Sequence, residues 1–159
     1  MTLTNQYLEQ AIERAIDDGN HIQKMIDSDY KTLILAMEQL HRARMAVQDT
    51  QREYDENEAG FLFLINFDEA AYPEWSAKEK LATNDAKRKV FKEHLIFWAQ
   101  THGPLTDTYT ALTNARLDKD DAQLAFDQAD KAFGATERSS ILQAAELQAI
   151  AGAAGRFYS

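Results

Sequence analysis

The chain has no cysteine, two prolines and six glycines among its 159 residues. The absence of cysteine excludes a disulfide framework, a thiolate metal site and a cysteine nucleophile. Because proline and glycine interrupt helices and mark turns, their scarcity favours long uninterrupted helices and opposes an all-β fold. The length, with 45% hydrophobic and 27% charged residues, is typical of a single globular domain over residues 1–159.

The sequence also lacks long apolar runs and a secretion signal. No apolar stretch approaches the roughly 20 residues that span a bilayer. The first residues, Met1 to Glu9, contain neither the basic nor the apolar region of a signal peptide. We therefore expect a cytoplasmic protein that does not enter a membrane.

Acidic side chains outnumber basic ones, 26 to 17, which gives a net charge of −9 at pH 7. A chain of this charge is repelled by phosphate backbones, so generic nucleic-acid binding is disfavoured. The distribution is uneven, because residues 53–74 contain seven acids and no Lys or Arg, whereas residues 78–92 contain six bases and two acids. The basic segment is either a solvated surface or the site of an acidic counterpart.

Apolar residues recur at helical spacing from the start of the chain. They do so over residues 3–16, and Asp17 to Asn20 then supply the turn chemistry that ends or kinks a helix. A seven-residue repeat follows and predicts a coiled-coil-like helix of roughly 35 residues, about 50 Å long. Tyr30 and Met37 occupy its alternating positions, and its main line is Ile26, Leu33, Leu40, Val47 and Tyr54.

A compact insert is expected next. Asn57 to Gly60 predict the end of the long helix, and the apolar run of residues 61–67 fits either a buried strand or a helical segment. Pro73 and the capping box from Ser76 to Glu79 predict a short helix.

A further helix follows this short one. Asn84 is placed to cap its start, and His102-Gly103-Pro104 predict its end because proline cannot continue the hydrogen-bond ladder.

The last part of the chain is again helical in pattern. From Leu105 it extends for about 45 residues if Gly134 is tolerated at roughly 1 kcal/mol, and residues 151–155 are expected to fray. Alanines fall at alternating three- and four-residue steps, which lets a second helix approach closely. These alanines are Ala111, Ala115, Ala122, Ala125, Ala129 and Ala132, and Leu112, Phe126 and Phe133 lie one position over.

Together these patterns predict an all-α fold of two long antiparallel, coiled-coil-like helices. N-terminal helices occupy residues 1–57, the central insert residues 58–104 and the long C-terminal helix residues 105–159. The two seams contain more apolar surface than two helices of one chain can cover, so we expect another copy to close them in an oligomeric helical bundle.

The motifs of common enzyme classes are absent from the sequence. There is no glycine-rich phosphate loop, no Gly-x-Ser-x-Gly elbow and no His-Glu-x-x-His pattern. Glu38 and His41 have the spacing of a metal-binding pair in helical bundles, but the comparable pair, Asp18 and His21, lies about 30 Å away along a helix. We expect no catalytic residue, no metal and no cofactor.

The basic segment contains the best candidate site. Arg88 and Lys92 stand one turn apart on one helix face, Lys87 flanks them, and Asn84 opens the helix, whose N-terminus favours anions. Trp75 and Trp98 are near enough in sequence to offer a stacking surface, or they are core residues. These six residues are the predicted site for an anionic ligand.

A capping Asn followed by an acidic residue and then by Arg and Lys, opening a helix that precedes a long Ala- and charge-rich helix, resembles small helical accessory proteins of tailed phages. Asn84 and Arg88 carry the resemblance, which covers residues 83–151. It implies a viral protein of the host cytoplasm that acts by binding. Some such proteins help recombination, some inhibit host nucleases or defence systems, and some are oligomers that sequester nucleotide signals.

Two functions follow from these features. The first is a homo-oligomeric anti-defence binder that takes up an anionic, nucleotide-like small molecule, as a sponge does. The alternative is an inhibitor whose acidic surface mimics nucleic acid and occupies a basic cleft on a host nuclease or effector, or a recombination accessory protein. The predicted partners are thus the chain itself and either an anionic small molecule or a host protein.

Overall fold

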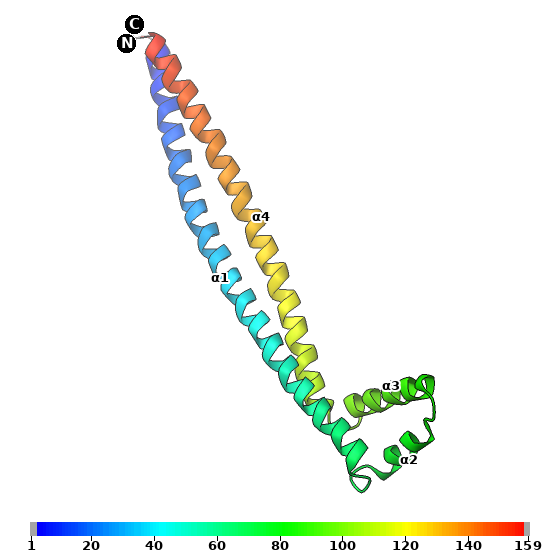
Figure 1. Ribbon diagram of the computed structural model, residues 1–159. Helices are drawn as coiled ribbons and strands as arrows, with labels where there is room; N and C mark the ends of the chain where they lie inside the picture. The colour runs from blue at the N-terminus through cyan, green and yellow to red at the C-terminus, as the bar shows by residue number, and fades with distance from the viewer. Residues whose placement is uncertain (1–2, 158–159) are drawn as a thin grey trace. The chain divides into compact units, whose positions relative to one another are not determined.

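The computed structural model describes residues 3–157, and this part of the chain contains four α-helices and no strand (Figure 1). They are α1 (Leu3–Phe67), α2 (Pro73–Leu81), α3 (Asp85–Thr101) and α4 (Thr106–Phe157). The predicted all-α fold class is confirmed. The chain divides into two compact units, a terminal unit of residues 1–40 and 122–159 and a central unit of residues 41–121.

The predicted breaks in α1 are wrong. The helix continues through Asp17 to Asn20 and through Asn57 to Gly60, and it ends at Phe67. A helical glycine costs only about 1 kcal/mol relative to alanine, which tertiary contacts readily offset. Residues 61–67, for which both strand and helix were open, are therefore the last turns of α1.

The sequence correctly predicted a long helix for α4, but the predicted length was too short. The helix passes through Gly134 as expected, but it has 52 residues and ends at Phe157. The fraying predicted for residues 151–155 is wrong, because these residues are helical. A helix built from alanine and other strong helix formers can extend past isolated glycines.

The two helices of the terminal unit are antiparallel. Gln143 Nε2 of α4 donates a hydrogen bond to the Ala15 carbonyl of α1 at 3.0 Å. The rings of Tyr30 and Phe133 are 5.9 Å apart. The α4 residue in contact thus has a lower number where the α1 residue has a higher one, so the two helices run in opposite directions. Figure 1 shows the two segments side by side.

The main line of the seven-residue repeat is confirmed as the packed side of α1. Leu40 and Tyr54 are buried, and Ile26, Leu33 and Val47 are half-buried. These exposures are those of a single copy of the chain.

The alternating positions of the repeat lie one residue earlier than predicted. Tyr30 and Met37 are 53% and 50% exposed, whereas Ala36 is 6% exposed and Asp29 is half-buried. The small side chain at position 36 allows close approach of the opposing helix, and the larger side chains remain at the edge of the contact.

The alanine seam of α4 is correct in part. Ala115 and Ala129 are buried and Ala122 is half-buried, but Ala111, Ala125 and Ala132 are exposed. The other half of the packed face consists of the larger residues one position over, Leu112, Phe126 and Phe133. Alanine therefore alternates with large side chains along this face, which fills the space between the helices.

The central unit has a small apolar core formed by all four helices. Ile65 of α1, Leu95 of α3, Leu105 just before α4 and Leu112 of α4 are at most 2% exposed. Aromatic side chains surround this core, and they are Phe61, Tyr72, Trp75, Phe91 and Trp98. The ends of α1 and α4 and the short helices α2 and α3 are thereby held together.

Local polar contacts fix the two short helices. Ser76 is buried inside α2 and donates a hydrogen bond to the Ile65 carbonyl at 3.2 Å. The predicted capping box is therefore wrong, because α2 begins at Pro73 and Ser76 instead ties it to α1. The end of α3 is as predicted, at Thr101, just before His102 and Gly103.

Candidate ligand-binding site

Asn84 caps α3 as predicted. Its side-chain oxygen accepts a hydrogen bond from the Lys87 amide at 2.9 Å, and its backbone is extended. The cap satisfies one of the free amide groups at the helix start. Asn84 thus determines where α3 begins. Its side-chain oxygen already accepts the hydrogen bond from the Lys87 amide.

Arg88 joins α3 to the end of α2. Its Nε donates a hydrogen bond to the carbonyl oxygen of Ala82, the residue that follows α2, at 3.3 Å. One terminal nitrogen lies 3.8 Å from the Asp85 carboxylate, which is an ion pair on an exposed surface. Arg88 therefore has a structural contact through Nε in addition to any contact that its terminal nitrogens make with a ligand.

Arg88 and Lys92 line one cavity of about 250 Å³. The end of α1, α2 and α3 surround it, and it lies within the central unit. Its other polar residues are Asn66 and Glu79, and its apolar wall is Leu62, Ile65, Phe91 and Leu95. The pairing of Arg88 with Lys92 on one face, which the sequence predicted, thus places both cations at one recess.

Lys87 lies elsewhere. It lines a second recess of about 470 Å³ between α2 and α3, together with Lys78. The rest of this groove is apolar and consists of Leu81, Ala82, Ala86, Val90 and Phe91. The three predicted cations are therefore divided between two recesses that share Phe91.

Trp75 and Trp98 contact one another, with ring centroids 5.4 Å apart. Trp98 also lies 6.4 Å from Phe61, and Trp75 lies 6.0 Å from Phe91. The Lys78 ammonium is 4.4 Å from the centre of the Trp75 ring, a cation–π distance. Neither tryptophan is among the residues that line the 250 Å³ cavity, so the structure assigns both to the aromatic cluster.

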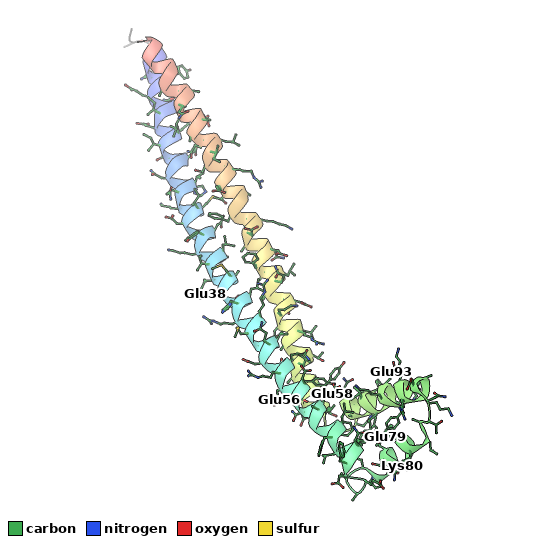
Figure 2. The ribbon with its side chains drawn as sticks, in the orientation of Figure 1. Glu38, Glu56, Glu58, Glu79, Lys80 and Glu93 are labelled. Atoms are coloured by element: carbon green, nitrogen blue, oxygen red, sulfur yellow. The ribbon has the colours of Figure 1, made fainter. Side chains whose placement is uncertain are left out.

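Two polar residues of the cavity were not predicted, Asn66 and Glu79. Each carried a weak signal in the sequence. Asn66 is the one polar residue in the apolar run of residues 61–67, and Glu79 was taken as part of a capping box. In the structure Glu79 lies on the side of α2 that faces α3 (Figure 2).

A second buried polar contact lies at the other end of α3. Gln100 Nε2 donates a hydrogen bond to the Tyr54 hydroxyl oxygen at 2.7 Å. Burial raises the pKa of Tyr54 above its ordinary value of 10.0, the bond from Gln100 opposes this rise, and Glu58 adds to it. Tyr54 remains a neutral phenol at physiological pH and links α1 to α3.

Comparisons of the chain with protein-family models, with curated proteins and with solved structures found no match. Over residues 3–157, no helix combines the length and the apolar character needed to cross a membrane. Within the same range, no three His, Asp or Glu side chains are grouped closely enough to hold a metal ion.

Proposed function

We propose that the protein is a non-catalytic binder that takes an anionic small molecule into the cavity between α1, α2 and α3. The observation that supports it is the position of Arg88 and Lys92, two cations from successive turns of α3, at one recess with an apolar wall. Cations and amide donors above apolar surface are typical of sites for organic anions. Asn66 adds a further donor, and the Glu79 carboxylate at the same recess limits how much negative charge the ligand can carry there.

The size of the cavity limits the ligand. A volume of about 250 Å³ is slightly below the roughly 300–1,000 Å³ of sites for drug-sized molecules. We expect a compact ligand no larger than a single nucleotide, which falls within the class of nucleotide-like anions expected from the sequence. Each copy binds one such molecule, and the protein lowers the free concentration of the ligand in the host cytoplasm, as the resemblance to phage anti-defence proteins implies. We also propose that the chain self-associates.

A titration tests the binding function directly. Purified full-length protein is titrated calorimetrically with inorganic phosphate, a nucleoside monophosphate and a cyclic dinucleotide. Lys92→Met should weaken binding of the preferred anion by roughly tenfold or more, because a hydrogen bond to a charged group contributes about 1.5–3 kcal/mol. Lys89→Met is the matched control, because Lys89 is an exposed cation of the same helix that lines neither recess. Equal affinity of both variants, or no binding by the parent, would contradict the proposal.

The acidic surface supports the second function, inhibition of a basic host protein. Six of the seven acids in residues 53–74 are exposed, and Glu58 is the half-buried one. Glu56 and Glu58 lie on α1 in the central unit (Figure 2). Charge reversal at exposed Glu53 and Glu56 should abolish binding to a basic nuclease or effector and leave the small-anion titration unchanged.

A further inference from the structure

The groove between α2 and α3 presents exposed apolar side chains next to charged ones. Leu81 is 73% exposed and Val90 is 50% exposed, and both line this recess of about 470 Å³. Lys78 and Lys87 are its two charged residues. A partner that fits it therefore offers large apolar side chains with carboxylates close by.

The chain itself offers such a group at the end of α1. Phe63 and Phe67 lie one helical turn apart, with ring centroids 4.7 Å apart, and they are 60% and 75% exposed. Asp68 and Glu69 follow them directly and are exposed. We call these four residues the aromatic knob.

The knob and the groove of one copy do not meet. Ile65 is 2% exposed and faces the core of the central unit. At about 100° per residue, Phe63 and Phe67 each lie roughly 200° around the helix from Ile65. The two rings therefore point away from the core to which α2 and α3 contribute, and no residue of the knob lines the groove of its own copy.

We infer that the aromatic knob of one copy occupies the α2–α3 groove of a second copy. The two surfaces are complementary, because two adjacent aromatic rings would meet the apolar residues of the groove and two carboxylates would meet two ammonium groups. The Glu69 carboxylate contacts Lys80 at 2.7 Å within its own copy, but that pair is exposed and contributes little, so Glu69 can exchange partners. The inference deepens the proposed self-association and rests on it, and it is independent of ligand binding.

A complementation experiment with the full chain tests the contact. Sedimentation of the parent should give a multiple of 18.1 kDa. Phe63→Ser/Phe67→Ser removes the knob, and Lys78→Glu/Lys87→Glu reverses the charge of the groove. Each double variant alone should be monomeric, with at least about a tenfold loss of affinity between copies. A mixture of the two should regain a two-chain species, because the groove of the first variant and the knob of the second are still intact.

Matched variants and named outcomes make the test decisive. Phe97→Ser changes an aromatic residue of the same unit that is 65% exposed and lines neither recess, and it should leave the mass unchanged. Melting curves of all variants should show cooperative unfolding. A monomeric parent would refute self-association as a whole, whereas a parent oligomer that keeps its mass in both double variants would refute this contact alone. Loss of mass in the groove variant but not in the knob variant would mean that another segment fills the groove and would also overturn the inference.

Discussion

The Thr136 hydroxyl on α4 donates a hydrogen bond to the Asp29 carboxylate on α1, and their oxygen atoms are 2.5 Å apart. Thr136 is 6% exposed and Asp29 is half-buried, so this polar pair lies inside the contact of the two helices in the terminal unit. A slip of one helix along the other removes this donor from the Asp29 carboxylate, whereas Thr136 keeps its contact with the Ala132 carbonyl of its own helix at 3.2 Å. The pair therefore specifies the register of the helices.

Thr136→Val should lower the free energy of unfolding by about 1–3 kcal/mol, because a half-buried carboxylate then loses its donor. Thr113→Val is the control, since Thr113 is exposed and its hydroxyl bonds to the Tyr109 carbonyl of its own helix at 2.8 Å. It should cost less than about 0.5 kcal/mol. Chemical denaturation measures both, and an equal effect of the two variants would contradict the role of the pair.

Leu40→Ala should destabilise the protein by about 2–4 kcal/mol, because Leu40 is only 4% exposed and its loss leaves a cavity. Met37→Ala should cost much less, since Met37 is 50% exposed. The same denaturation experiment compares them. A larger effect at Met37 would show that the register derived from burial is wrong.

The long helices and their main apolar line could be predicted from the sequence because a seven-residue repeat is a local property of the chain. The helix breaks could not, since Gly19 and Gly60 are turn signals only where no tertiary contact supports a helix. The alternating positions of the repeat were misplaced for a related reason. The seven-residue spacing predicted that Tyr30 is covered, whereas the space beside the opposing helix decides which residue is covered, and there it is Asp29.

The cavity likewise combines residues that a local pattern predicts with residues that only the tertiary fold brings together. Arg88 and Lys92 share a face of one helix, so their spacing was sufficient to bring them together. Asn66 and Glu79 come from α1 and α2, and their approach depends on how the chain folds back, which no local pattern encodes. The sequence left two roles open for the tryptophans, a stacking surface for a ligand and a place in the core. The packing of Trp75 on Trp98, with ring centroids 5.4 Å apart, supports the core role.

Gly103→Ala should destabilise the central unit by about 1–3 kcal/mol, because a Cβ there would lie 2.7 Å from the Ala99 Cα, which is a backbone atom and cannot turn aside. Gly60→Ala is the control in the same unit. A Cβ at Gly60 meets nothing within 4 Å, so this change should stabilise α1 by about 0.5–1 kcal/mol. Thermal melts should move in opposite directions, and a common direction would contradict the packing of the α3–α4 turn.

Stability should depend on the ionisation of Tyr54 in alkaline solution. Burial raises the pKa of Tyr54 in the folded protein above 10.0. The contribution of the neutral Tyr54 phenol to the free energy of unfolding is therefore complete below pH 10. It is lost as the pH rises through the pKa of Tyr54 in the folded protein, because the unfolded chain releases this proton first. The free energy of unfolding should fall less steeply above pH 10 in Tyr54→Phe than in the parent. Tyr7→Phe removes a phenol that is 70% exposed and should keep the parent's slope.

The charge at Glu79 distinguishes the classes of ligand that the cavity can take. Glu79 lines the cavity with Arg88 and Lys92, whereas Glu93 lies on the far side of α3 (Figure 2). If the ligand is purely anionic, as we propose, Glu79→Gln removes a repulsive charge and should tighten binding by about fivefold or more, since unit charges about 4 Å apart interact by about 1 kcal/mol even in bulk water. Glu93→Gln changes the net charge equally and should leave the affinity almost unchanged.

The effect of Glu79→Gln should shrink as salt is added to the extent that the site is open to solvent. Weaker binding by Glu79→Gln would mean that the ligand also carries a cationic group that pairs with this carboxylate, and equal changes in both variants would mean that the anion binds outside the cavity.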